Sequence, residues 1–278
     1  MFQRKDDKLM RSRTAKEHVM KCHNMYFNEI MSSIDRSRIF YDNGMGFVVD
    51  GKTGDVPAVQ QSMGYAPSNV LFYKGDTASC LYEMNKSVHN GKIMVLNFAS
   101  WYSPGGRYLN GDIAQEEALC SQSFLYNVLS STPIVRMYYS RHDGVETNGV
   151  FNHDCIYSPD ILFFYNDCNI FADVLTIAAP DFRPFLKMGG NNVSLRYQLC
   201  KVRHDRVKVM LSVAKYCGIK NIILGAWGCG VFKNSVIEVS QEFRGYLTNE
   251  FVSDFDIVAF AIPHSSSHKF EKFRSVWM

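Results

Sequence analysis

Six short apolar runs constrain the fold of this chain more than any other feature. They span residues 70–73, 93–99, 161–164, 173–179, 221–224 and 256–261. Each run is apolar nearly throughout rather than alternating with polar residues, which is typical of strands covered on both faces. Longer segments with helical spacing lie between several of them. The sequence therefore predicts an α/β fold, a three-layer α/β/α arrangement around a mixed, mostly parallel sheet.

The helical segments are marked by apolar spacing and by capping residues. One helix is expected within 235–251, where Val239, Phe243 and Leu247 recur behind a cap signal at Ser235. Another is expected from residue 207 to a stop at Gly218. Residues 1–40 predict one or two helices in front of the sheet. The segments 41–68 and 140–160 are expected to be long connections.

Composition limits the class of protein. The 278 residues are 46% hydrophobic and 21% charged, as in ordinary globular chains. No apolar run reaches the roughly 18 residues of a membrane span, and the N-terminus is charged where a signal peptide is apolar. An intracellular protein is therefore expected, cytoplasmic with the nucleus left open, without membrane contact.

Cysteine and charge patterns add little to this. Eight cysteines occur without any C-x-x-C pair, so reduced, buried thiols are expected rather than disulfides or a metal site. The net charge of +3 includes basic stretches at 1–40 and 196–208. Solvated helix faces are favoured there over a track for a polyanion.

A glycine pair and a glutamate pair share the stretch PGGRYLNGDIAQEEALC, residues 104–120. It follows the run 93–99, and a helix is expected from about 114 to 125. Gly105 and Gly106 let backbone amides approach a ligand. Glu116 and Glu117 are either ordinary acids of a first helical turn or a pair that divides the labour of glycosidic cleavage. Adjacent helical residues diverge by roughly 100°, so the two roles must differ.

A second glycine-rich turn follows the run 221–224. It reads GAWGCGVFKN, residues 225–234, and precedes the helix expected within 235–251. Two such turns together would bind a diphosphate between their backbone amides. Taken singly, each turn can also be interpreted as a plain tight turn. Lys74, Gly75 and Asp76 follow the first apolar run, where a plain turn is as good an interpretation as a pocket wall.

Long motifs in the chain resemble one family. NFASWYSPGGRYLNGDIAQEEALCSQSFLY, residues 97–126, is similar to the signature of the microbial-type poly(ADP-ribose) glycohydrolases, macrodomain proteins with a GGG, x6 to x8, QEE catalytic loop. IYSPDILFF at 156–164, IAAPDFRP at 177–184 and LGAWGCGVFKN at 224–234 extend the resemblance over most of residues 70–265. It implies a helical extension with its connection at 1–68 and a macrodomain at 69–278.

The resemblance also implies an activity, the cleavage of ribose–ribose O-glycosidic bonds in poly(ADP-ribose) with release of ADP-ribose. Gln115, Glu116 and Glu117 match the QEE. Glu117 matches the general acid, Glu116 the residue that hydrogen-bonds hydroxyls at the scissile linkage, and Asn97 the residue that orients the distal ribose.

The glycine-rich turns match the binding elements of the family. Gly105 and Gly106 belong to the catalytic loop, Gly228, Cys229 and Gly230 match the diphosphate loop, and Phe232 with Val231 matches the apolar contact on the distal ribose.

The family also sets expectations about ligands and partners. No metal and no cofactor is implied. The expected partners are poly(ADP-ribose) or ADP-ribose and ADP-ribosylated proteins, and a monomer is expected. Two alternatives stay open, a macrodomain that binds ADP-ribose without turnover and a hydrolase that removes single ADP-ribose units from protein or nucleic acid.

One position departs from the family. Arg107 stands where the third glycine of the GGG is expected. If that position needs a positive φ, an arginine there strains or obstructs the site. Alternatively, its guanidinium contacts the diphosphate or the next unit of the polymer.

Overall fold

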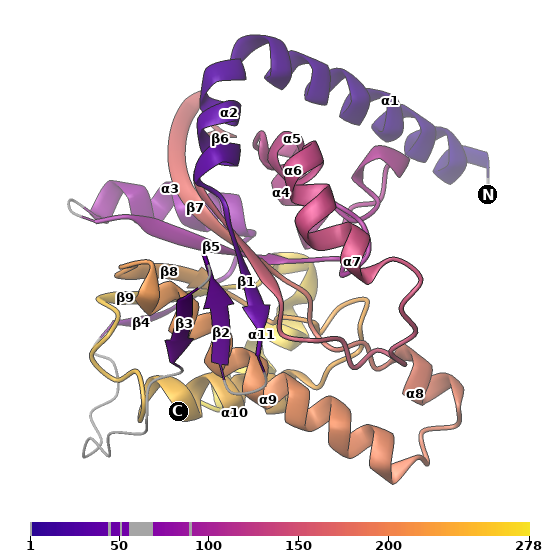
Figure 1. Ribbon diagram of the computed structural model, residues 1–278, viewed down its shortest axis with the longest axis vertical. Coiled ribbons are helices and arrows are strands. Elements are labelled where there is room, and N and C mark those ends of the chain that lie inside the picture. The colour runs from indigo at the N-terminus through magenta and orange to yellow at the C-terminus, as the bar shows by residue number, and fades with distance from the viewer. Residues whose placement is uncertain (1, 44–45, 51, 56–68, 89–90) are drawn as a thin grey trace.

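The strands form one sheet. The computed structural model describes residues 2–43, 46–50, 52–55, 69–88 and 91–278. Within these ranges nine strands lie in the order β3-β2-β1-β6-β7-β5-β8-β9-β4 (Figure 1). Their bounds are β1 Arg38–Asp42, β2 Gly46–Val49, β3 Lys52–Asp55, β4 Val70–Tyr73, β5 Ile93–Phe98, β6 Cys155–Tyr165, β7 Cys168–Ile177, β8 Asn221–Leu224 and β9 Ile257–Ala261.

The sheet divides into a parallel and an antiparallel half. Strands β7, β5, β8, β9 and β4 run parallel to one another. Strands β3, β2, β1, β6 and β7 pair antiparallel. The predicted mixed sheet is confirmed, but its order is not mostly parallel: four of the eight pairings among the described strands are parallel and four are antiparallel.

Helices cover both faces of the sheet (Figure 1). On one side are α1 Phe2–Met25, α2 Phe27–Arg36, α3 Thr77–Ser87, α4 Gln115–Ser121, α5 Leu125–Leu129, α6 Thr132–Ile134, the π-helical turn η2 Val135–Tyr139 and α7 Ser140–His142. On the other are α9 Val193–Tyr216, α10 Val236–Leu247 and α11 Ser267–Ser275. Short elements complete the chain: the 3-10 turns η1 Tyr108–Asn110 and η3 His264–Ser266, and α8 Arg183–Lys187.

Strand β5 shows why the apolar runs produce two cores. Met94 and Leu96 pack into the cluster that contains α9 and α10. Ile93 and Val95 point to the opposite cluster with α3, α4 and α5. Because successive strand residues face opposite sides, a strand covered twice needs apolar residues at every position. The predicted α/β/α layering is confirmed.

All six predicted strands are present, and two extend beyond the predicted runs. Residues 161–164 lie within β6, and 173–177 lie at the end of β7. The segment 41–68 was expected to be a connection, and this was wrong for its described part, because 38–55 contributes β1, β2 and β3. The rest of that segment, 56–68, lies outside the described residues. The division of the chain at residue 68 stays a prediction.

The helix predicted at 114–125 ends earlier. Helix α4 stops at Ser121, and α5 begins at Leu125. The buried Ser123 hydroxyl donates to the Leu119 carbonyl (2.7 Å) and accepts from the Leu125 amide (3.1 Å). A serine that bonds the backbone in this way competes with helix continuation. The segment 140–160, expected to be a connection, includes α7 and the start of β6.

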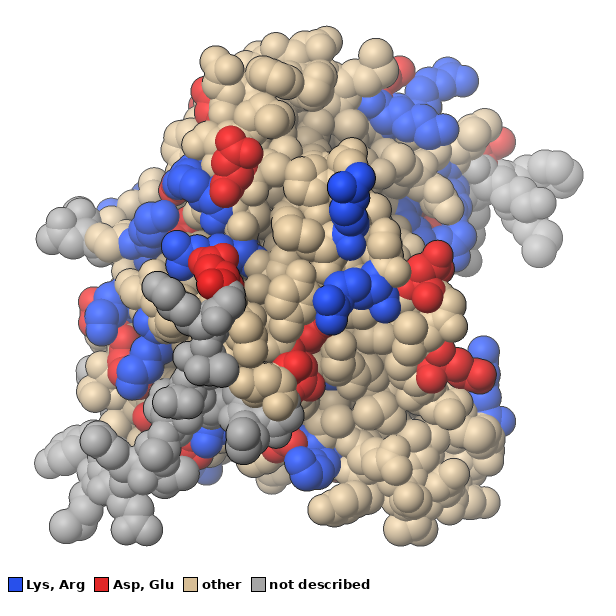
Figure 2. Space-filling view, in the orientation of Figure 1, with Lys and Arg blue, Asp and Glu red and all other residues tan. Residues whose placement is uncertain are grey.

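No helix among the described residues is long and apolar enough to cross a membrane. On the face shown in Figure 2, basic and acidic side chains lie among each other. All eight cysteines are free. Buried thiols were expected, and five are buried, whereas Cys200 and Cys217 are half-buried and Cys168 is exposed.

Candidate active site

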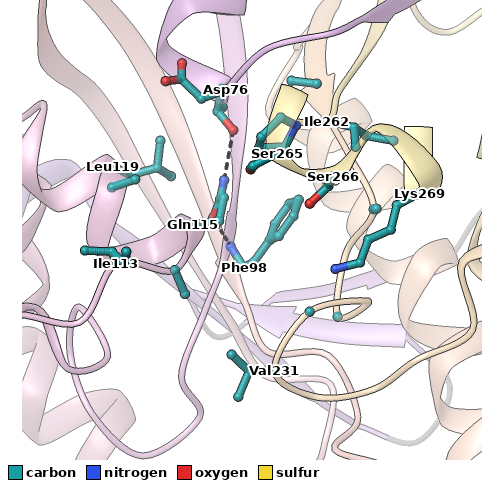
Figure 3. A pocket seen from close by; sticks show the side chains of 18 of the residues that line it. Asp76, Phe98, Ile113, Gln115, Leu119, Val231, Ile262, Ser265, Ser266 and Lys269 are labelled. Atoms are coloured by element: carbon teal, nitrogen blue, oxygen red, sulfur yellow. Dashed lines mark hydrogen bonds between the residues drawn. The ribbon is translucent and has the colours of Figure 1, made fainter. Parts of the chain in front are cut away.

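A cavity of about 460 Å³ opens beyond the carboxyl ends of β5, β8 and β9. Figure 3 shows its walls, which come from the start of α4, the turn after β8, and η3 with α11. Ligands of open α/β sheets bind outside the carboxyl ends of the strands. Of the predicted site residues, five line the cavity: Gln115, Gly228, Gly230, Val231 and Phe232.

Glu116 is buried and fixed on both oxygens. Its Oε1 accepts from Asn97 Nδ2 (3.1 Å), and its Oε2 accepts from the Ser100 amide (2.6 Å). Asn97 on β5 is itself fully buried and donates to Thr176 Oγ1 (3.2 Å) as well. Burial raises the pKa of Glu116 to about 8, against the opposing effect of the Ser100 and Asn97 hydrogen bonds, and the adjacent Glu117 adds to the rise. Burial therefore favours the protonated form of Glu116 near neutral pH.

Glu117 is buried with one oxygen left over. Its Oε1 accepts from the Arg107 amide (2.9 Å). Its Oε2 is buried and has no hydrogen-bond partner among the described residues. A buried polar atom without a partner is costly, and in a native site it calls for a proton, a water or a ligand. The two glutamates thus differ, as the divergence of adjacent helical residues predicts.

Gly106 lies directly against both carboxylates. Its φ is +59°, and a Cβ built there falls 2.6 Å from Glu117 Oε1 and 2.9 Å from Glu116 Oε2. Gly105 also has a positive φ, and its missing side chain leaves room for Tyr126 and Cys120. The PGG turn is therefore bare because the two glutamates occupy the side-chain space of Gly106, and Tyr126 and Cys120 occupy that of Gly105.

Gln115 holds the start of α4 on β5. Its Oε1 accepts from the Phe98 amide (2.8 Å), and its Nε2 donates to the Leu96 carbonyl (2.9 Å) and to Thr77 Oγ1 (3.1 Å), as Figure 3 shows in part. All of its polar atoms are thus engaged with protein. The side chain fixes the helix from which Glu116 and Glu117 project, and neither glutamate is among the residues that line the cavity.

Position 107 does not require a glycine. Its φ is −112°, a value open to any residue, so the predicted strain at this position is absent. Its side chain is 65% exposed, and its Nε lies 3.4 Å from Asp112 Oδ2. Arg107 is not among the residues that line the cavity. What it contributes here is its backbone amide, which holds Glu117.

The turn after β8 forms the opposite wall. The Asn234 amide group clamps it, with Nδ2 donating to the carbonyls of Pro180 (2.8 Å) and Gly228 (3.1 Å). Cys229 is buried beneath the turn and Val231 is exposed at its tip. Phe232 lines the cavity and packs beside Trp101 and Phe151. Because Trp101 follows Ser100, this packing connects the cavity wall to the loop that binds Glu116.

Several wall residues carry no local sequence signal. Lys269 of α11 reaches into the cavity (Figure 3), and no ion pair joins it to a carboxylate among the described residues. Its neighbour Glu271 pairs with Lys74 (3.7 Å). Burial raises the pKa of the Cys229 thiol to about 12, and the Lys269 charge opposes this rise. The positive charge of Lys269 is therefore felt at Cys229, within the glycine-rich turn. For Asp76 the sequence left open a pocket wall or a plain turn. In the structure Asp76 lines the cavity, and its side chain caps α3 by accepting a hydrogen bond from the Ser79 amide.

The sequence profile described as microbial-type PARG, catalytic domain, matches residues 12–166, more than half of the chain. The chain belongs to this family. No curated protein sequence matches it.

Solved structures of similar fold come from two bacteria. A poly(ADP-ribose) glycohydrolase of Thermomonospora curvata has a TM-score of 0.80 at 23% identity, over 96% of this chain and 99% of that one. The same enzyme bound to the inhibitor ADP-HPD scores 0.75 at 22% identity, over 96% and 98% of the two chains. A poly(ADP-ribose) glycohydrolase of Deinococcus radiodurans in complex with ADP-ribose scores 0.71 at 23%, over 89% and 96%. At this identity the likeness establishes the shared fold, which confirms the macrodomain predicted for the microbial-type family.

Proposed function

We propose that the chain hydrolyses the ribose–ribose O-glycosidic bonds of poly(ADP-ribose) and releases ADP-ribose. The observation that carries this is the buried glutamate pair at Gly106, in which one carboxylate is fully bonded and the other keeps an oxygen without a partner. Glycosidic cleavage requires a proton donor and a fixed polar group at the scissile linkage. Membership of the microbial-type family and the ligands named for the similar structures support the same substrate class.

Glu117 is the general acid in this proposal. Its Oε2 gives a proton to the ribose oxygen that leaves, and the bond between that oxygen and the anomeric carbon breaks. The positive charge of the resulting oxocarbenium-like ribose is stabilised by the nearby phosphate. Water then attacks the anomeric carbon and returns a proton to the Glu117 carboxylate, so the enzyme ends as it began.

Glu116 and Asn97 orient the ribose. Both Glu116 oxygens already accept from protein donors, and carboxylate oxygens have capacity for further donors, so a ribose hydroxyl adds to an arrangement that is fixed beforehand. Fixing a group before the substrate arrives spares the cost of ordering it later. Asn97 acts on the ribose through its hold on Glu116.

The rest of ADP-ribose fits the cavity beside the pair. The diphosphate lies at the turn of Gly228, Cys229 and Gly230, whose two glycines line the cavity and carry no side chain, and Lys269 adds a positive charge from the opposite wall. Phe232 and Val231 give the ribose an apolar contact. About 460 Å³ lies within the range of sites that bury most of a small ligand.

The test is cleavage of end-labelled poly(ADP-ribose) followed by separation of the products. Release of free ADP-ribose is the expected result. Chains that stay intact at high enzyme and long incubation, while calorimetry shows ADP-ribose binding, would instead identify a protein that binds the polymer without cleaving it. Release of ADP-ribose from singly modified protein but not from polymer would move the activity to mono-ADP-ribosyl hydrolysis.

A further inference from the structure

The first helix lies on the catalytic loop rather than apart from it (Figure 1). Three hydrogen bonds and an ion pair join α1 to residues 108–112. Arg11 Nε donates to the Gly111 carbonyl (2.8 Å), and Ser12 Oγ donates to the Leu109 carbonyl (2.6 Å). The Tyr108 hydroxyl bonds His18 Nδ1 (3.0 Å), and Lys8 pairs with Asp112. Side chains from residues 8–18 of the helix therefore hold one short loop.

Gly111 shows how closely the two segments meet. A Cβ built at this residue falls 2.3 Å from the Lys8 carbonyl oxygen and 3.1 Å from the Ser12 amide nitrogen. Its φ of +78° is also one that side chains rarely adopt. Backbone thus packs on backbone at this point, which leaves the loop little freedom to shift along the helix.

Helix α1 is itself anchored to the body of the protein. Ala15 and Cys22 are buried in the cluster that also contains α4 and α5. Asn127 Nδ2 of α5 donates to the Val19 carbonyl (3.0 Å). The position of α1 is therefore fixed by its packing on the body of the protein, independently of the loop.

The supported loop ends at the glutamate pair. The Arg107 carbonyl accepts from the Asn110 amide (2.9 Å), so the 3-10 turn η1 ties Arg107 to the residues that α1 holds. The amide of the same Arg107 donates to Glu117 Oε1 (2.9 Å). One covalent and hydrogen-bonded path thus runs from Ser12 and His18 to the Arg107 amide, which donates to Glu117 Oε1.

We propose that α1 is a positioning element of the active site, in which Ser12 and His18 hold the loop so that the Arg107 amide keeps Glu117 aligned. This rests on the role of Glu117 in the proposed function. None of the residues that line the cavity, as far as the chain is described, belongs to α1. Loosening this contact therefore slows the chemical step and leaves ADP-ribose binding in place, because a misalignment of about 1 Å costs roughly a hundredfold in rate.

The experiment compares Ser12→Ala, His18→Phe and their double variant with the full-length wild type. Arg13→Ala is the matched control, since Arg13 lies on the exposed face of the same helix. Ser12→Thr keeps the hydroxyl and tests rescue. We expect kcat to fall about tenfold in each single variant and further in the double, with KM and ADP-ribose affinity within about twofold. Hydrogen exchange of the amides in 105–112 becomes faster in the same variants.

The outcomes separate this inference from the proposed function. An unchanged kcat in the folded double variant overturns the inference, as does a loss of ADP-ribose affinity equal to the loss of kcat, or a Ser12→Thr variant as slow as Ser12→Ala. A wild type without turnover refutes the proposed function alone. The exchange measurement still tests the helix in that case, and unaltered exchange in the double variant overturns the inference.

Discussion

Replacing Gly106 by alanine tests whether this glycine exists to admit the two carboxylates. The added Cβ falls 2.6 Å from Glu117 Oε1 and 2.9 Å from Glu116 Oε2, well inside van der Waals contact. Both carboxylates, or the loop, must move by roughly 0.5–1 Å to make room. Displacement of that size in a catalytic group costs about a hundredfold in kcat.

The same substitution also strains the backbone. A φ of +59° costs alanine about 1 kcal/mol relative to glycine, which lowers Tm by roughly 2–4 °C in a chain of this size. Gly144→Ala is the matched control, because Gly144 has a φ of +70° and its Cβ meets nothing within 4 Å. This control carries the strain without the collision.

Two measurements decide the outcome, thermal unfolding and steady-state cleavage of poly(ADP-ribose). We expect a larger loss of Tm in Gly106→Ala, which carries the collision as well as the strain, and about a hundredfold loss of kcat only in that variant. Comparable kcat values in Gly106→Ala and Gly144→Ala would refute the reasoning, since backbone strain would then account for everything the glycine does.

Three further predictions concern charge. Arg107→Ala and Arg107→Gly leave ADP-ribose binding within about twofold at low and high salt, because the exposed side chain does not line the cavity, and Arg107→Gly does not raise turnover, because a φ of −112° strains no side chain; calorimetry at two salt concentrations and polymer turnover check this, and faster turnover in Arg107→Gly contradicts it. Lys269→Gln weakens ADP-ribose binding about two- to fivefold and leaves adenosine binding unchanged, whereas Lys272→Gln on the same helix changes neither, as calorimetry will show. The pKa of about 8 for buried Glu116 predicts that wild-type stability falls between about pH 5 and pH 8 relative to Glu116→Gln, because the unfolded state releases this proton first; parallel Tm curves for the two proteins would show that the pKa is not raised.

The central strands could be predicted because burial on both faces leaves a strong pattern. Strands β5 and β8 are apolar at nearly every position, and their interior location requires this. Strands β1, β2 and β3 were missed, since they form an antiparallel edge in which exposed positions and glycines break the pattern. Tertiary contact decides the structure there. Phe40 and Phe47 pack on each other and on Tyr216 of α9, a residue distant in sequence.

The candidate site could be predicted in composition but not in arrangement. The motif identified Glu116 and Glu117, yet only the structure shows that one of them is bonded on both oxygens and the other is not. Lys269 and Ser12 were missed, because each gains its place from the packing of a helix and carries no local signal. The motif raised the question of backbone strain at Arg107, because the family has a glycine there. The φ that decides this strain is set by the surrounding turn and cannot be read from the motif.

Glu117→Gln measured with both polymer and ADP-ribose tests the central claim most directly. Glutamine keeps the shape of the side chain and its bond from the Arg107 amide (2.9 Å) but cannot give a proton to the leaving oxygen. The account predicts that turnover of poly(ADP-ribose) is lost while ADP-ribose affinity stays within roughly tenfold of wild type, because the acid acts mainly in the transition state. Turnover near the wild-type rate in a correctly folded Glu117→Gln protein would contradict it.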